Sequence, residues 1–295
     1  MKRSMQLAVP AGIVLIVVML VVPLPAAMLD FLIALNITGA LLVLMVAMFV
    51  SRPLDFSAFP AVLLVMTLFR LALNVSATRL VLIDGYAGKV IDTFGHFVVG
   101  GSLVVGLIVF VILLVIQFVV ITNGAGRVAE VGARFTLDAM PGKQMAIDAD
   151  LNSGLITEDQ ARTRRQEVHA EADFYGAMDG ASKFVKGDAI AAIIITIVNL
   201  LGGFGVGVVQ HKMAMGDAAS TYSLLSVGDG LVSQIPALLL SVATGLVVTR
   251  STSDADMGSD ILRQLGRSRT PLQVAGFGAL GLCLIPGLPK LPFIM

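Results

Sequence analysis

The chain has 295 residues and no net charge, with 57% hydrophobic residues, only 14% charged residues and a mean hydropathy of +0.92. A soluble domain carries about 25% charged residues. This composition therefore excludes a soluble globular protein and indicates an all-α polytopic membrane protein. The zero net charge gives no reason to expect a nucleic-acid partner. One cysteine, Cys283, excludes a disulfide framework and a cysteine-based zinc site, and His96, His169 and His211 are too scattered to form a metal site. No metal or cofactor is expected.

The apolar stretches predict the membrane spans. A helix needs about 20 apolar residues to cross roughly 30 Å of hydrocarbon. The basic N-terminus and its apolar continuation resemble a signal peptide, but the apolar core is long and no cleavage site follows, so we expect a retained first span. The expected spans are residues 7–25, 29–50, 59–82, 97–121, 188–209, 224–249 and 271–286. Pro286 and Pro289 end the last of them, and Leu291 to Met295 read as the start of an eighth span that the chain end interrupts.

The basic residues predict the orientation. If the N-terminus is cytoplasmic, 15 of the 20 Lys and Arg residues lie on that side, three lie on the other, and Arg70 and Arg79 lie within a span. This asymmetry follows the positive-inside rule. The predicted organisation is spans 1–4 in residues 1–121, a cytoplasmic region in 122–187, and spans 5–7 with the start of span 8 in 188–295.

The cytoplasmic region has 66 residues, of which ten are acidic and eight basic. It is too long for a simple linker. We expect a turn at 138–142, a loop at 148–155, and a helix to about Met178 that opens with a capping box of Thr157 and Gln160. The prediction is a small helical domain beneath the membrane.

Two motif matches in this region do not carry a function. Gly124 to Ala129 fit the G-x-G-x-x-A dinucleotide pattern, but a membrane-length apolar run precedes them where the fold requires a short strand. Asp148, Asp150 and Asn152 resemble the start of a calcium loop. However, Ser153 replaces the required glycine, and the twelfth position is Asp159 instead of Glu.

Two arginines lie within one apolar stretch, where a central arginine costs about 2.5–3.5 kcal/mol on insertion scales. Thr67, Arg70 and Asn74 share one helix face by their i, i+3, i+4 spacing. That face should meet a partner, a cavity or the bundle interior. Arg79 points to the opposite face near the far end. Its side chain either snorkels to the membrane surface or contacts another subunit.

Two aspartates begin or interrupt apolar stretches. Asp188 follows Lys186-Gly187 and is either a carboxylate that favours a helix N-terminus or a proton-binding group at the cytoplasmic mouth. Asp229, between Gly228 and Gly230, is either a turn or cap residue or the second end of a proton route to Asp188. The flanking glycines permit a bend or the close approach of a neighbour.

Four segments carry a family resemblance. Residues 134–154 (RFTLDAMPGKQMAIDADLNSG), together with 68–82, 171–189 and 226–250, closely resemble in wording and order the recurrent segments of the FHIPEP family. These proteins are the large membrane subunits of type III secretion export gates. The resemblance covers about residues 28 to 290, and the Asn123 to Arg127 run is similar to the flagellar branch more than to the injectisome branch.

The resemblance implies eight spans in the bacterial inner membrane, followed by a large cytoplasmic domain that this chain lacks. It implies a homo-oligomeric ring, commonly of nine subunits, that joins other export-gate membrane proteins. Through the missing domain it would receive secreted substrates and their chaperones. The resemblance further implies that the protein couples the proton-motive force to protein export. The sequence itself shows no nucleophile–base set, P-loop or metal cluster, so no enzymatic activity is expected.

The resemblance also implies roles for particular residues. It favours export coupling for Asp188, and a contact with another subunit or the gate for Arg79. With Asp229 and Arg70, these two residues form the expected set for proton or export coupling. The charged residues of the loop that it connects with coupling are Arg127, Arg134, Asp138, Lys143, Asp148 and Asp150. From the residues alone, the charges nearest the membrane equally suit lipid headgroups and salt bridges.

Two other functions remain open. A proton-coupled small-molecule transporter would use the intramembrane charges, but such transporters often carry internal repeats, and none is seen here. A purely structural ring component would tolerate Asp-to-Asn changes. Uptake of a small solute into liposomes by the purified protein would favour the transporter. Unchanged export by an Asp188→Asn variant would favour the purely structural component.

Overall fold

The computed structural model describes residues 2–250, 258–259, 263, 266–267 and 269–282. Contacts between residues divide the chain into two compact units, Met1–Arg250 and Ser251–Met295. In the second unit, helix α10 (Arg269–Leu282) covers most of the expected span at 271–286. The expected eighth span, Cys283 and the proline pair lie outside the described residues.

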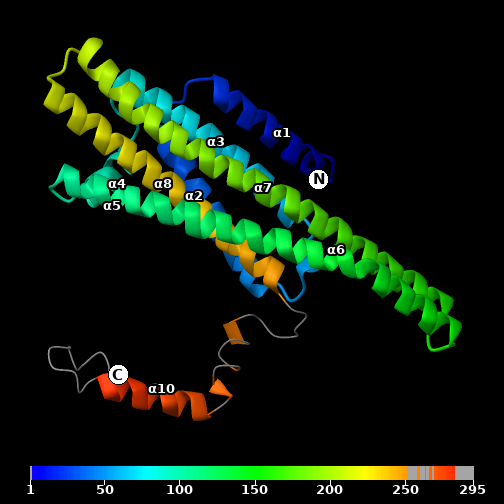
Figure 1. The fold of residues 1–295 in the computed structure, drawn as a ribbon. Coiled ribbons are helices and arrows are strands. Elements are labelled where there is room, and N and C mark those ends of the chain that lie inside the picture. The colour runs from blue at the N-terminus through cyan, green and yellow to red at the C-terminus, as the bar shows by residue number, and fades with distance from the viewer. Residues whose placement is uncertain (1, 251–257, 260–262, 264–265, 268, 283–295) are drawn as a thin grey trace. The chain divides into compact units, whose positions relative to one another are not determined.

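Every regular element described in the first unit is a helix (Figure 1). In chain order the elements are α1 (Lys2–Val21), α2 (Ala26–Phe49), η1 (Pro53–Phe56), α3 (Phe59–Asp84), α4 (Lys89–Val99), α5 (Leu103–Val115), η2 (Ile116–Thr122), α6 (Asn123–Asn152), α7 (Glu158–Val209) and α8 (Met215–Thr249). Within the described part, five stretches are long and apolar enough to cross a membrane: Ala26–Phe49, Pro53–Asp84, Leu103–Asn152, Glu158–Val209 and Met215–Thr249. The all-α polytopic prediction is confirmed, while the count of eight spans stays a prediction.

The fourth span begins later than expected. The prediction placed it at residues 97–121, but α4 ends at Val99 and a new helix begins at Leu103. Gly100 and Gly101 have positive φ values of 52° and 91°, a left-handed conformation that glycine adopts at little cost and that ends a helix. Residues 89–99 therefore form a short amphipathic helix that is separate from the span.

The turn expected at residues 138–142 is wrong. Helix α6 continues through Pro141 and ends only at Asn152, so the chain reverses at residues 153–157 and the expected loop at 148–155 is shorter than predicted. Proline in a helix interior removes a hydrogen bond and crowds the preceding turn. The packing of α6 along α7 and the salt bridge from Lys143 to Glu171, close to the proline, offset that cost.

The capping box at the start of α7 is confirmed. The Gln160 amide donates to Thr157 Oγ1 at 3.3 Å, and the Thr157 amide donates to Gln160 Oε1 at 2.9 Å. The helix does not end near Met178, however, but runs without interruption through Gly187 to Val209. One 52-residue helix therefore joins the expected cytoplasmic helix to the fifth span.

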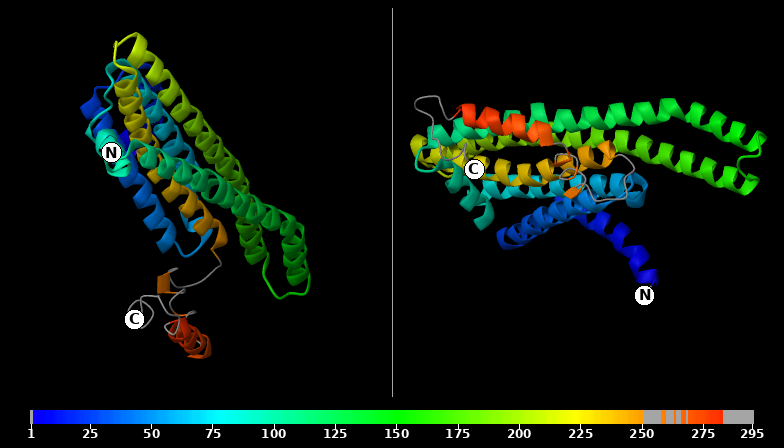
Figure 2. Two further views of the ribbon diagram at one scale, coloured as in Figure 1. Left: turned by 60° about the vertical axis from the view of Figure 1, so that its left-hand side comes forward. Right: turned by 90° about the horizontal axis from the view of Figure 1, so that it is seen from below.

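Helices α6 and α7 lie side by side and project beyond the other helices, as the views in Figures 1 and 2 agree. The continuous helix of residues 103–152 has 50 residues, about 75 Å at 1.5 Å per residue, which is more than twice the thickness of a hydrocarbon core. The region predicted as 122–187 is thus a helical hairpin continuous with two spans. Its standing as a separate domain stays a prediction.

Helix α8 lies at the centre of the first unit and packs against α2, α3, α4, α5, α6 and α7. Two of its glycines make this packing close. A Cβ atom on Gly228 would collide with the backbone carbonyl of Ile91 in α4, and one on Gly230 would lie 2.6 Å from the Phe110 ring in α5. The sequence offered two roles for these glycines, a bend in the helix or the close approach of a neighbour. The close approach is observed, since α8 does not break at either residue.

We expect Gly228→Ala to destabilise the protein by about 1–3 kcal/mol, because the new methyl group meets a backbone carbonyl that cannot rotate away. The thermal unfolding midpoint of the purified protein in detergent measures this. Gly245→Ala in the same helix is the control, since its Cβ meets nothing within 4 Å. Equal midpoints for the two variants would contradict the close crossing of α4 and α8.

Candidate functional site

Arg70 and Asp188 form an ion pair inside the helical bundle. Arg70 Nη2 contacts Asp188 Oδ2, and the two side chains are 4% and 0% exposed. Thr67 and Asn74, which share the helix face of Arg70, are also buried. The face predicted for Arg70 is therefore confirmed as facing the bundle interior, and its partner is a carboxylate from α7.

Asp188 does not begin a helix. It lies in the interior of α7, thirty residues after the helix starts at Glu158, so the prediction of a helix-start carboxylate is wrong. The physical reason is that Lys186-Gly187, which read as a boundary, fits into a helix that packs along both α6 and α3. The position of Asp188 is set by its pairing with Arg70, because an unpaired charge at this depth is costly.

Asp229 is the second buried carboxylate. Asn199 Nδ2 on α7 donates a hydrogen bond to Asp229 Oδ2 at 3.1 Å, and Asn199 and Asp229 are 0% and 5% exposed. Asp229 lies in the middle of α8, so the prediction of a turn or cap residue is wrong: α8 begins nine residues earlier than the expected span. Asn199 was not predicted, although a single amide within an apolar run of α7 is the signal that could have found it.

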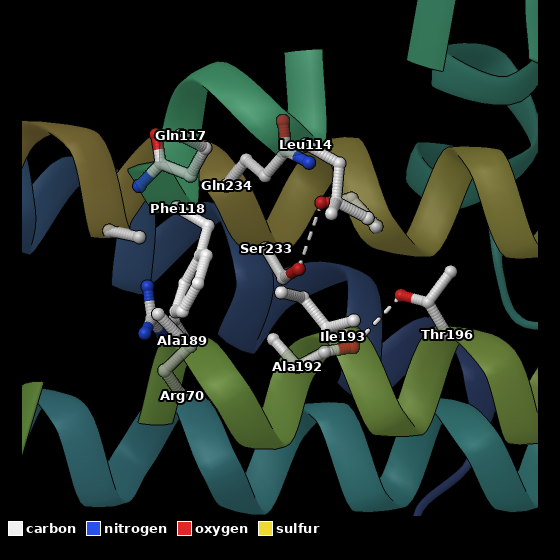
Figure 3. Close-up of a pocket in the computed structure, with 12 residues that line it drawn as sticks. Arg70, Leu114, Gln117, Phe118, Ala189, Ala192, Ile193, Thr196, Ser233 and Gln234 are labelled. Atoms are coloured by element: carbon white, nitrogen blue, oxygen red, sulfur yellow. Dashed lines mark hydrogen bonds between the residues drawn. The ribbon is translucent and has the colours of Figure 1, made fainter. Parts of the chain in front are cut away.

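Two small cavities border Arg70, and Asp229 lines one of them. One is lined by Arg70, Gln117, Thr196, Ser233 and Gln234 among apolar residues (Figure 3). It offers about 30 Å³ to the centres of water molecules, and roughly 10–15 Å³ of such space holds one water. The second is lined by Asn36, Asn74 and Asp229 and shares Arg70 and Ser233 with the first.

Polar atoms at these cavities have capacity for further hydrogen bonds. Arg70 Nε, Gln117 Nε2 and Asn36 Oδ1 are buried and make no hydrogen bond to protein atoms within the described residues. The same holds for Asn199 Oδ1, although Asn199, the hydrogen-bond partner of Asp229, lines neither cavity. Gln117 lies in η2, a π-helical segment between α5 and α6, and π-helical turns frequently mark functional sites. Neither Gln117 nor the π-helix was predicted; a glutamine in the fourth apolar stretch was the available signal.

Arg79 lies apart from this site. Its Nη1 donates to the carbonyl of Val21, the last residue of α1, at 2.8 Å. A cation at the C-terminus of a helix is favoured by the helix dipole and satisfies a carbonyl that has no partner inside the helix. The arginine therefore joins α3 to the end of α1, and a role in contacting another subunit or the gate stays a prediction.

The six charged loop residues divide into two groups. Lys143, Asp148 and Asp150 make salt bridges across the hairpin, to Glu171 at 2.6 Å, Arg165 at 2.5 Å and Arg164 at 3.0 Å. Together these pairs set the antiparallel register of α6 and α7. Exposed pairs of this kind contribute roughly 0–1 kcal/mol each, so they contribute more to register than to stability.

Arg127, Arg134 and Asp138 form the second group. They lie on the membrane-proximal half of α6, are exposed, and make no ion pair in the part of the chain that the structure describes. Opposite this half of α6, Lys183 Nζ donates to Asp179 Oδ2 at 2.7 Å. The hydrogen bond that Lys183 donates to this carboxylate, and the carboxylate's negative charge, raise the pKa of Lys183, so the lysine is charged at physiological pH.

These observations define a class: a multi-pass helical membrane protein with an ion pair, a second carboxylate and polar cavities among its spans. The family model described as the FHIPEP family matches residues 16–295. The chain therefore belongs to the FHIPEP family, and the resemblance found in its sequence is confirmed.

Relatives point to one branch of the family. The chain is 58% identical over 98% of its length to the flagellar biosynthesis protein FlhA of Escherichia coli and 57% identical to that of Salmonella typhimurium. It is 61% identical over 88% of its length to FlhA of Bacillus subtilis. The chain spans 42%, 42% and 38% of these relatives, which is less than half of each. No solved structure matches it significantly.

The ion pair predicts a particular pattern of stability. Asp188→Asn leaves Arg70 buried without its counter-charge, which should cost about 3–5 kcal/mol. Arg70→Gln combined with Asp188→Asn removes both charges and should recover much of that loss, because two neutral amides can hydrogen-bond at the same place. Thermal unfolding in detergent of the two single variants and the double variant measures the coupling. Additive losses would contradict a direct pair.

Proposed function

We propose that this chain is the membrane part of an export-gate subunit of a flagellar type III secretion apparatus, and that it couples the proton-motive force to protein export. The observation that carries the proposal is the buried set of ionisable groups, Arg70, Asp188 and Asp229, with two small cavities that both border Arg70. Family membership and flagellar relatives support the apparatus. The relatives give no support to a small-molecule transporter.

The arrangement suits proton binding. Carboxylates within membrane spans commonly mark proton relays. Water in the cavity beside Gln117, Thr196 and Ser233 would supply hydrogen-bond partners to Arg70 and connect the region of Asp188 with that of Asp229. When Asp188 accepts a proton, its attraction to Arg70 falls, so the equilibrium between a paired and an unpaired arrangement of α3 and α7 shifts.

Helix α7 extends this change to the cytoplasmic side. Asp188 lies on the same uninterrupted helix as the hairpin residues Arg164, Arg165 and Glu171, so a movement at the pair would displace the hairpin as a unit. One proton crossing 100 mV releases about 2.3 kcal/mol, and several protons would be needed to move a protein segment. No nucleophile–base pair is expected, and we propose a non-enzymatic subunit.

The proposal includes a location and an assembly. The N-terminus and the hairpin would face the cytoplasm of the bacterial inner membrane, as the positive-inside asymmetry favours. The subunit would form a homo-oligomeric ring, commonly of nine copies in the family, with other export-gate membrane proteins. Secreted proteins and their chaperones would bind to a cytoplasmic domain beyond this chain.

Flagellar protein export in cells that carry the full-length gene tests the proposal, with membrane levels of the subunit measured in parallel. We expect Asp188→Asn and Asp229→Asn each to lower export at least about tenfold, a barrier change of about 1.4 kcal/mol. Asp173→Asn, an exposed position on the hairpin, is the matched control and should export normally.

The double variant Arg70→Gln/Asp188→Asn separates coupling from structure. If the pair only stabilises the bundle, this variant should recover export together with stability. If export needs a titratable carboxylate at position 188, the double variant should accumulate normally in the membrane and still fail to support export. Recovery of export would refute proton coupling at Asp188 and favour a structural ring component.

A further inference from the structure

A polar cleft lies between α6 and α7 where the hairpin leaves the spans. It is lined from α6 and the end of η2 by Val119, Asn123, Gly124, Gly126, Arg127 and Glu130, and from α7 by Asp179, Ser182, Lys183 and Lys186. The i, i+3, i+4, i+7 spacing on each helix places these residues on two faces that oppose each other across the cleft. Its volume is about 740 Å³, within the roughly 300–1,000 Å³ typical of small-molecule sites.

The position of the cleft is that of lipid headgroups. Val119, at one end, is 55% exposed, and Val120 and Ile190 beside it are 63% and 42% exposed. These apolar side chains continue into the membrane-spanning parts of η2 and α7. A lipid whose acyl chains lie along them would therefore place its headgroup in the cleft.

The charges in the cleft are mixed. Arg127 and Lys186 make no ion pair within the described residues, whereas Lys183 is paired with Asp179 Oδ2. The Asp179 side chain is itself 30% exposed. Glu130 on the opposite wall is exposed. The cleft therefore offers two cations to an anion and the carboxylates of Asp179 and Glu130 to a donor.

We propose that this cleft binds the headgroup of phosphatidylethanolamine, with the phosphate on Arg127 and Lys186 and the ammonium group on Asp179 and Glu130. Hydrogen bonds between charged groups are the strong ones in such sites, and basic pockets between membrane helices hold lipid headgroups. A purely anionic headgroup would leave both carboxylates facing negative charge. A choline headgroup cannot donate a hydrogen bond to Asp179.

The glycines of the cleft give it room. A Cβ atom on Gly124 or Gly126 would meet nothing within 4 Å, so a larger side chain can be introduced there without disturbing a packed neighbour. Gly126→Leu would fill the cleft and leave every charge in place. Gly142→Leu is its matched control, because Gly142 lies on the same helix and is equally open.

Native mass spectrometry of the purified full-length protein tests the proposal. The probes are dioleoyl phosphatidylethanolamine, phosphatidylglycerol and phosphatidylcholine, each titrated in detergent. We expect the ethanolamine lipid to bind most tightly. Arg127→Gln or Lys186→Gln should weaken it about tenfold, the order of one charge-assisted hydrogen bond. Gly126→Leu should abolish binding. Arg162, an exposed residue near the start of α7 and outside the cleft, supplies a charge control, so Arg162→Gln and Gly142→Leu should leave binding unchanged.

The carboxylate variants give the sharpest result. Asp179→Asn or Glu130→Gln should weaken phosphatidylethanolamine but leave phosphatidylglycerol unchanged or tighter, so that the preference reverses. Equal or tighter binding of phosphatidylglycerol by the unmodified protein would overturn the proposal, as would insensitivity to Gly126→Leu. Displacement of the lipid by millimolar inorganic phosphate would show a free-anion site instead. Because binding is measured on purified protein, the outcome does not depend on export.

Discussion

The pairing of Arg70 with Asp188 is the constraint on which the arrangement of the spans depends. Both side chains are buried, and breaking such a pair from one side costs about 3–5 kcal/mol. The pair therefore fixes the register of α3 against α7 more tightly than apolar packing alone, because apolar side chains tolerate sliding and a charge pair does not. Under the proposed proton coupling the same property would make the pair a switch, since protonation of Asp188 would remove the attraction that holds this register.

Asp229 supplies a second ionisable group without a cation of its own. It accepts a hydrogen bond from Asn199 and lines a cavity with Arg70, so both carboxylates lie in the surroundings of one arginine. The close crossing of α8 with α4 and α5 at Gly228 and Gly230 holds Asp229 in that place. The group formed by Arg70, Asp188 and Asp229 depends on the position of α8. Because α8 packs against six other helices of the first unit, a movement of α8 at Asp229 would shift its contacts with most of the bundle.

Much of this could be predicted from the sequence, and the failures have physical causes. Hydropathy located the apolar stretches, and the cost of a central arginine predicted that Arg70 faces a partner or cavity. Asp188 was not predicted as the partner of Arg70, because Lys186-Gly187 read as the start of a new helix. Gly187 and Pro141 each weaken a helix locally. Both helices continue because α6 and α7 pack against each other, and that packing cannot be read from local sequence. Asn199 and Gln117 were missed because one amide in an apolar run gives a weak signal until a partner is known.

The hairpin of α6 and α7 links the buried ion pair to the polar cleft. Its distal half is fixed by salt bridges from Lys143, Asp148 and Asp150, and α7 connects this half directly to Asp188. Between them the membrane-proximal half opens into the polar cleft, where Arg127 and Lys186 make no ion pair within the described residues. A hairpin paired at its tip and open at its base can change the spacing of α6 and α7 at the membrane surface without breaking its tip. A bound headgroup would then set the spacing of α6 and α7. It would thereby also set the free energy that is needed to move α7.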